Sequence, residues 1–296
     1  MPLHSQSPSF SDTKLSSCIT EFALPLTAVQ GREYYPSGTA IIIAPHLALT
    51  AKHVILDYWK RLEGNAPSTG EHATSFAIQA IQVLDSGSSG AVFDITRLWC
   101  CAGTDIAFLR LSPTSKQSLQ YQWRPVRMSL LPPAVGRRIS AFGYRDSRIT
   151  VNQQGSHREV VWYDKPTTSI GEVLEIYNES RDRTRLNFPC FQVNARFDGG
   201  MSGGPVFDDT GRLCGLICSN LPPSSSKEDH VSYVTTLWPC MGTPIDLDRQ
   251  GFPTGIQYPA LELAQHGHID ADGWQQILLT RDESGKILNV GLRVPS

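Results

Sequence analysis

Short runs of apolar residues, each bounded by glycine, proline or polar turn-forming residues, follow one another from Phe22 onward. Runs of this length between turn signals predict β-strands rather than amphipathic helices. The predicted strands are the following segments: Thr39–Ala44, Leu47–Thr50, Phe76–Leu84, Val92–Trp99, Ile106–Leu111, Arg137–Phe142, Glu159–Tyr163, Glu172–Tyr177, Phe188–Val193, Gly204–Phe207, Arg212–Cys218 and Val231–Leu237. So many short strands at near-regular spacing indicate an all-β fold, either a barrel or a sandwich.

Helix is predicted at two places, as a turn after Lys52 and as a short helix over Pro259–His266. Residues 1–20 begin with a stretch rich in serine and proline, which predicts a disordered N-terminal tail. The polar, proline-bearing segment Ser112–Pro133 is the expected linker between two halves of the chain.

The composition predicts a folded chain and excludes several kinds of partner. Of the 296 residues, 40% are hydrophobic, so a sizeable core can form without disulfides or metal ions. The formal net charge of −2 gives no basic field that would attract nucleic acid. No apolar run approaches the roughly 18 residues of a membrane span, and the start of the chain lacks the features of a signal peptide. We therefore expect a cytoplasmic protein that binds neither nucleic acid nor a membrane.

The seven cysteines are an odd number and include no C-x-x-C pair. In a cytoplasmic protein such residues are expected to be reduced thiols, most of them buried. If Cys214 and Cys218 lie on one strand, they are roughly 13 Å apart, too far to chelate one ion. The sequence therefore implies no metal site and no cofactor.

Three segments carry residues suited to nucleophilic catalysis. His53 follows the end of a predicted strand, Asp105 opens another strand, and Ser202 lies in the glycine-rich loop Asp198–Val206. A serine hydroxyl is a poor nucleophile at neutral pH and needs a base, for which imidazole has a suitable pKa. A buried carboxylate would fix the imidazole tautomer and stabilise the imidazolium that forms. Asp57, one helical turn after His53, is the competing candidate for this carboxylate and is expected on the exposed side of a short helix.

The glycines beside Ser202 allow backbone conformations that other residues resist. In such a loop, backbone N–H groups can converge on the oxygen that becomes negatively charged during acyl transfer. The N–H groups of Gly200 and Ser202 are the expected donors.

These segments resemble the chymotrypsin-like, or trypsin-fold, serine peptidases. His53 stands in Thr-Ala-x-His, Asp105 in Asp-Ile-Ala-x-Leu and Ser202 in Gly-x-Ser-Gly-Gly-Pro, and the chain order His, Asp, Ser is that of the family. The resemblance covers Phe22 to Leu237 and implies two antiparallel six-stranded β-barrels, with the active site in the cleft between them.

The implied organisation has four parts. A disordered tail over residues 1–20 precedes a first barrel over 21–122 with His53 and Asp105. A second barrel with Ser202 covers 123–255. Residues 256–296 form a short C-terminal helix and an extension packed on the barrels.

Some positions set this chain apart from secreted members of the family. Met201 replaces the acid that those enzymes carry before the serine, and Gln192–Ala195 is more similar to the HtrA-like and bacterial intracellular branch. No pattern typical of a PDZ domain follows Leu237. Met201 cannot pair with the N-terminal amine that activates secreted relatives. The loop Asp198–Val206, called the serine loop below, is therefore expected to be ordered by packing or by a partner.

The resemblance implies a serine endopeptidase that cleaves proteins or peptides through an acyl-enzyme. Narrow specificity or a regulatory protein partner would restrain such an enzyme, and compact bacterial relatives often act in defence or stress systems. By position, the floor of the primary pocket falls near Arg196, and its walls at Cys218, Ser219 and Asn220. An arginine there could pair with a carboxylate; if it turned to solvent, the pocket would take small apolar side chains. In either case cleavage after Lys or Arg is not expected to be preferred.

Two other functions remain open from the sequence. Gly200–Gly204 also satisfies G-x-S-x-G, which would suit an α/β-hydrolase esterase, although that fold requires a helix directly after the serine. A catalytically silent binding protein could keep the peptidase fold.

Overall fold

The computed structural model describes residues 8–14, 17–64, 70–72, 76–84, 89–154, 157–221, 230–246 and 255–293. Strands dominate the regular structure, which confirms the predicted all-β fold. Each predicted strand overlaps an observed one, and the two segments predicted over Glu159–Tyr163 and Glu172–Tyr177 belong to one long strand. Strand β13(Pro205–Asp208) follows Ser202 where an α/β-hydrolase would need a helix, so the esterase alternative is excluded.

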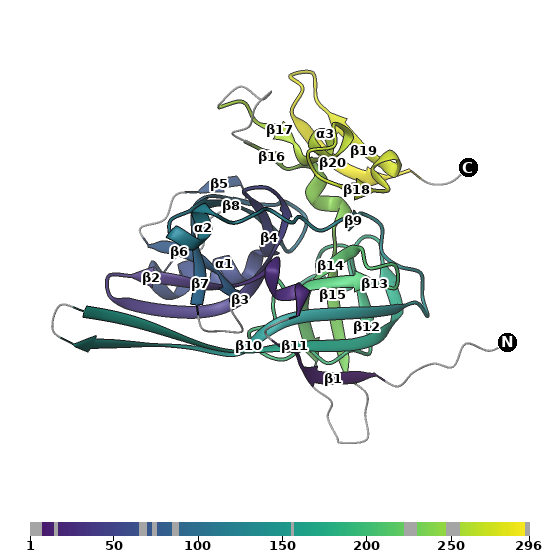
Figure 1. Cartoon of the computed structure of the whole chain (residues 1–296). Helices are drawn as coiled ribbons and strands as arrows, with labels where there is room; N and C mark the ends of the chain where they lie inside the picture. The colour runs from purple at the N-terminus through teal and green to yellow at the C-terminus, as the bar shows by residue number, and fades with distance from the viewer. Residues whose placement is uncertain are drawn as a thin grey trace.

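Six strands close the first barrel by antiparallel pairing (Figure 1). In ring order they are β7(Ser89–Cys100), β6(Ala77–Leu84), β2(Ala23–Gln30), β3(Glu33–Ala44), β4(Leu47–Ala51) and β8(Ile106–Pro113), and β8 pairs back onto β7. The short strand β5(Gly70–His72) pairs with the end of β7. Closure leaves no free edge among the six strands.

Strand β3 carries an unbroken apolar run because both of its faces are buried. Ala40 and Ile42 belong to the core inside the first barrel. Ile41 and Ile43 belong to a second core, which also contains Phe142 of the other barrel. A strand that is covered on both sides has no polar face, so the usual alternation of apolar and polar residues is absent.

Six further strands close the second barrel. In ring order they are β13, β10(Arg138–Gln154), β11(His157–Tyr177), β12(Cys190–Val193), β15(Val231–Thr236) and β14(Leu213–Leu221), and β14 pairs back onto β13. Strands β10 and β11 run far beyond the ring as a long hairpin, which Figure 1 shows extending past the first barrel. The sequence pattern predicts the start of β10 and two separate parts of β11, but it does not predict that each strand is continuous along the hairpin.

The chain after the second barrel forms small elements around one short helix, α3(Ala260–Gln265), within the segment predicted as helical. They are the 3₁₀ turns η3(Trp238–Gly242) and η4(Trp274–Gln276) and the strands β16(Pro244–Ile245), β17(Tyr258–Pro259), β18(Ala271–Asp272), β19(Ile277–Arg281) and β20(Ile287–Leu292). Strand β18 pairs with β9(Met128–Ser129), which pairs with β14. The hairpin of β19 and β20 has no counterpart in the sequence-based expectation.

Two further helices lie in the first half of the chain. Helix α1(Lys52–Leu62) is longer than the single turn predicted there, because Val54, Ile55, Tyr58 and Trp59 give it an apolar stripe that packs into the first barrel. Helix α2(Lys116–Leu119) lies in the expected linker and is capped by Ser115.

The start of the chain departs from the expected disordered tail. Ser9–Asp12 forms strand β1, paired antiparallel with β11, and Cys18–Glu21 forms the 3₁₀ turn η1. Residues 1–7, 15 and 16 lie outside the described residues. A low apolar content argues against a core but not against an edge strand, whose backbone groups pair with a neighbouring strand whatever the side chains.

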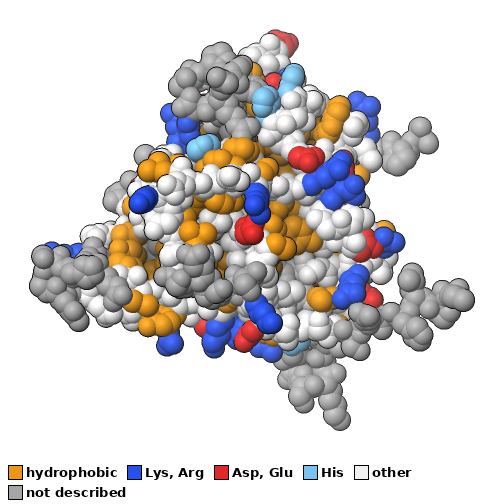
Figure 2. Space-filling view, in the orientation of Figure 1, with side chains coloured by type: hydrophobic (Ala, Val, Ile, Leu, Met, Phe, Trp, Pro, Cys, Tyr) orange, Lys and Arg blue, Asp and Glu red, His pale blue; other side chains and the backbone are white. Residues whose placement is uncertain are grey.

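No helix within the described ranges is long and apolar enough to cross a membrane. Basic and acidic side chains are interspersed on the face shown in Figure 2. This distribution agrees with the small net charge of the chain.

Candidate active site

His53 is the second residue of α1, and its position depends on Asp105. The backbone N–H of His53 donates to Oδ1 of Asp105 at 2.9 Å, and His53 Nδ1 lies 2.7 Å from Oδ2. Strand β4 leads into α1 and pairs with β8, which starts directly after Asp105, so the two residues meet at one end of the barrel. The residue before α1, Ala51, offers no side-chain cap, and the carboxylate of Asp105 takes that role from the bend before β8.

The carboxylate of Asp105 is nearly enclosed, whereas the imidazole reaches solvent. The Asp105 side chain is 7% exposed and that of His53 is 35% exposed. Burial by itself would lower the pKa of His53, but the hydrogen bond and the negative charge of Asp105 raise it, and the net pKa lies above the ordinary 6.5. Asp105 therefore holds the ring in one orientation and favours its protonated form.

Ser202 lies in the loop between β12 and β13, held against the first barrel. Its carbonyl accepts a hydrogen bond of 2.8 Å from the N–H of Thr39 on β3. The next residue, Gly203, has a φ of +78°, and a Cβ there would overlap Thr50 and the Thr39 carbonyl. A side chain at position 203 would thus be strained and would push the serine loop away from the first barrel.

The N–H groups of the serine loop divide into two kinds. Those of Met201, Gly203 and Gly204 donate to the carbonyls of Asp198, Ile217 and Met201. For the N–H groups of Gly200 and Ser202, the two donors expected from the sequence, no acceptor exists within the described part of the chain. These two N–H groups can therefore donate to an oxygen of a bound molecule.

A cleft of about 410 Å³ brings the three predicted catalytic residues together. His53, Asp105 and Ser202 line it with Arg185, Phe188, Phe197, Asp198, Gly199, Ile217, Cys218 and Ser219. Arg185 and Phe188 come from the loop between β11 and β12, and no motif in the sequence marks them. Their place in the cleft follows from closure of the second barrel, which is a long-range property.

Arg196 does not line the cleft, so of the two predicted alternatives the structure supports the one in which its side chain turns to solvent and not the one that puts it at the pocket floor. Its guanidinium makes a two-pronged ion pair with Asp198, at 2.8 and 2.9 Å, and its side chain is 44% exposed. It also lies over the ring of Phe10 on β1, 4.4 Å from the centroid. Asp198 itself lines the cleft, and Arg196 pairs with the charge of its carboxylate.

The predicted pocket walls Cys218 and Ser219 do line the cleft, and the side chain of Asn220 lies outside the described residues. Burial, together with the neighbouring Asp105 carboxylate, raises the pKa of the Cys218 thiol well above its usual value. The donor atoms of His53, Asp105 and Cys218 lie within 4.8 Å of one another, and these residue types can bind zinc. Metal binding would require a thiolate and would break the hydrogen bond between His53 and Asp105.

The remaining predictions concern Asp57 and the cysteines. Asp57 is exposed on α1, as expected, and contributes only the weakest of the effects on the pKa of His53. All seven cysteines are free thiols; Cys18 is exposed and the other six are buried.

Comparison with known proteins shows which family the chain matches. The model of the trypsin-like peptidase domain matches residues 38–216. Among solved structures, an inactive serine-to-alanine mutant of Rv3671c from M. tuberculosis H37Rv is 13% identical, with a TM-score of 0.43 over 75% of this chain and 84% of that one. Deg5 is 15% identical, with a TM-score of 0.45 over 72% of this chain and 83% of its own. A comparison with curated proteins gave no match.

Proposed function

This chain belongs to the family of trypsin-like peptidase domains, which are serine endopeptidases, and on that premise we propose that Ser202, His53 and Asp105 are its catalytic triad. Ser202 is the nucleophile, His53 the general base and Asp105 the carboxylate that orients His53. The observation that carries the proposal is the double contact of Asp105 with the backbone N–H and Nδ1 of His53, in the cleft that Ser202 lines.

In the proposed reaction, Ser202 Oγ attacks the carbonyl carbon of the peptide bond while its proton passes to Nε2 of His53. The imidazolium then gives that proton to the leaving amine as the C–N bond breaks, and an acyl ester remains on Ser202. A water molecule, deprotonated by His53, hydrolyses the ester and restores the enzyme. Asp105 stays ionised throughout and stabilises the imidazolium.

The N–H groups of Gly200 and Ser202 are the proposed oxyanion donors. The carbonyl oxygen of the substrate becomes negatively charged in each tetrahedral intermediate, and two preorganised amides lower the energy of that charge. Support comes from the contrast within the loop, since the neighbouring amides of Met201 and Gly203 are used inside the protein.

Internally quenched peptides with blocked termini test the endopeptidase function. We expect cleavage at internal amide bonds, inhibition by a fluorophosphonate and no requirement for an added metal. A chain that hydrolysed simple esters but no peptide in a broad library would contradict the proposal.

The pH dependence of kcat/KM should report the ionisation of His53. Because neutral imidazole is the active base, activity is lost as the pH falls through the pKa of His53. Asp105 raises this pKa, so the acidic limb of the profile is expected above pH 6.5. A profile whose acidic limb lay at or below the ordinary value would contradict the assigned role of Asp105.

The charge in the cleft supports an expectation about specificity. Two carboxylates line the cleft, and each has a partner: Asp105 is bonded to His53 and Asp198 to Arg196. Arg185 also lines the cleft and is exposed, and within the described part of the chain it forms no ion pair. We propose that Arg185 disfavours Lys and Arg before the scissile bond and favours acidic or neutral residues. In a peptide-library profile, Arg185→Gln should raise cleavage after Lys or Arg by at least about threefold relative to other residues. The control is Arg183→Gln, a neighbouring exposed arginine that does not line the cleft.

We also propose that the proteolytic activity of this enzyme is restricted. An endopeptidase inside a cell must not cleave indiscriminately, and either narrow specificity or a regulatory protein partner would prevent this. The setting we propose, a bacterial defence or stress system, rests on the resemblance to compact bacterial peptidases. Co-purification of the Ser202→Ala chain from its host, with the wild-type chain as control, would identify a partner or a trapped substrate.

A further inference from the structure

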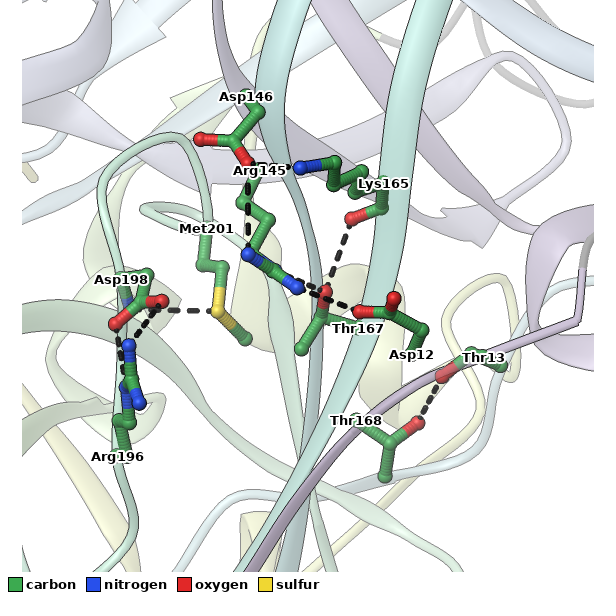
Figure 3. A network of polar contacts seen from close by, with 10 residues as sticks. All are labelled: Asp12, Thr13, Arg145, Asp146, Lys165, Thr167, Thr168, Arg196, Asp198 and Met201. Carbon is green, nitrogen blue, oxygen red and sulfur yellow. Dashed lines mark hydrogen bonds and ion pairs between the residues drawn. The ribbon is translucent and has the colours of Figure 1, made fainter.

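The N-terminal strand β1 pairs with β11, and its side chains contact Arg196 and Arg145, which adjoin the loop carrying the proposed oxyanion donors. Figure 3 shows Asp12, Arg145 and the turn with Asp198 and Met201. The residues of β1 pair antiparallel with β11, from Ser9 opposite Ile170 to Asp12 opposite Thr167. Beyond the strand, the N–H of Thr13 donates to the carbonyl of Pro166 at 2.7 Å, and its hydroxyl lies 2.5 Å from that of Thr168. The start of the chain is thus fixed to the second barrel by main-chain and side-chain bonds.

Phe10 connects β1 to the serine loop through Arg196. The guanidinium of Arg196 lies 4.4 Å from the centre of the Phe10 ring, and the ring packs on the core of the second barrel. The same guanidinium holds both carboxylate oxygens of Asp198. An exposed ion pair between residues this close in sequence is weak by itself. The ring of Phe10 restricts Arg196 to one orientation and so fixes the direction in which it holds Asp198.

Asp198 in turn is bonded to the residue before Ser202. The carbonyl of Asp198 accepts from the N–H of Met201 at 3.2 Å, and the N–H of Asp198 lies 3.4 Å from the Met201 sulfur (Figure 3). These two contacts close the turn Asp198–Met201, which contains Gly200 with a φ of +91°. A displacement of the Asp198 main chain would therefore move the N–H groups on either side of Met201, and the ion pair with Arg196 restrains Asp198 through its side chain.

A second set of contacts runs from Asp12 to the other side of the same turn. Asp12 forms an ion pair of 2.6 Å with Arg145, and Arg145 Nε donates to the Thr167 hydroxyl at 2.9 Å. The carbonyl of Tyr144 and the Cα of Arg145 lie 2.7 and 3.2 Å from the position that a Cβ would take on Gly200. The main chain that packs on Gly200 is thus anchored to β1 as well.

We propose that β1 orders the serine loop, with Phe10, Asp12 and Arg196 as positioning residues for the N–H groups of Gly200 and Ser202. The inference rests on the proposed function, which assigns those two groups. It gives a physical role to a folded N-terminal strand in a chain where an apolar residue, Met201, stands before the serine and is fully buried.

Kinetics of full-length variants test this role. Phe10→Ala should lower kcat for an amide substrate by about 10- to 100-fold and leave KM within about twofold, since the loss of a single oxyanion donor costs about 10²- to 10³-fold. The affinity for a peptide boronate, which mimics the tetrahedral intermediate, should fall by the same factor as kcat/KM. Phe10→Tyr, which keeps the ring, should restore activity. Ser11→Ala, at an exposed position on the same strand, is the matched control and should equal the wild type.

Arg196→Gln removes the other partner of the contact between Phe10 and Arg196, and it should lower kcat by a similar factor. The Phe10 ring also lies 5.5 Å from the guanidinium of Arg145. Since part of the effect of Phe10 passes through Arg196, the losses of the two single variants should be less than multiplicative in the double variant. Equal kcat for Phe10→Ala and Ser11→Ala, or a loss confined to KM, would overturn the inference while the proposed function stands. A wild-type chain that neither cleaves peptides nor binds the boronate would contradict the proposed function itself.

Discussion

Replacement of Ser202 by alanine is expected to lower kcat/KM for peptide hydrolysis by about 10⁴- to 10⁶-fold. The substitution removes the hydroxyl that attacks the peptide and leaves the loop in place, because the loop is held by backbone groups. The Ser202 carbonyl accepts from Thr39, and the amides of Gly203 and Gly204 donate to Ile217 and Met201. Alanine keeps all of these bonds. Steady-state kinetics, with thermal unfolding to verify the fold, measure the effect.

His53→Ala should be as damaging as Ser202→Ala, and the double variant should be no worse than either single one. The two residues act as a unit, so removing the second partner costs little once the first is gone. Turnover by Ser202→Ala equal to that of the wild type would contradict the assignment of the nucleophile. If the losses in kcat/KM of the two single variants multiplied in the double variant, the two residues would not act in the same step of the reaction.

Replacement of Asp105 by asparagine is expected to lower kcat by about 10⁴-fold. Asp105 accepts two hydrogen bonds from His53, one from the backbone N–H and one from Nδ1. An asparagine side chain has only one accepting oxygen, so its amide group would face Nδ1 or the backbone N–H as a second donor. The imidazole would then adopt the tautomer that cannot take the proton from Ser202.

Asp57→Asn is the matched control, since it makes the same chemical change near the same histidine. Asp57 is exposed on α1, and within the described part of the chain its carboxylate forms no hydrogen bond or ion pair with the His53 ring, so its substitution should change kcat by less than about threefold. If Asp57→Asn lowered kcat severely while Asp105→Asn left kcat unchanged, the acid of the triad would be misassigned.

The parts of the fold that depend on local sequence can be predicted well. Strand β4 is a short apolar run that ends at the helix carrying His53, and Asp105 marks the start of β8 in the same way. Glycines flank Ser202 because Gly203 adopts a positive φ against Thr50. Each of these features is visible in a few consecutive residues, so the candidate triad can be identified without the structure.

Features that depend on distant contacts cannot be predicted from the same patterns. The serine-rich start of the chain lacks the apolar residues of a core strand, yet Ser9–Asp12 pairs with β11 through its backbone. Counting positions from Ser202 puts Arg196 in the pocket, but Asp198 and Phe10 hold it outside. Arg185 enters the cleft from a loop that no motif marks. Strand β1 needs β11 as its partner, Arg196 stacks on Phe10, and Arg185 is placed by closure of the second barrel, so each outcome depends on residues far away in the chain.

The most direct test of the central claim, that Ser202 is an activated nucleophile in the intact chain, is fluorophosphonate labelling followed by peptide mass spectrometry. The 296-residue chain with a tag that blocks its N-terminus should gain one adduct per chain, on Ser202, and His53→Ala should remove the labelling. Absence of an adduct, an adduct on another residue, or labelling that appeared only after removal of residues 1–20 would contradict the account.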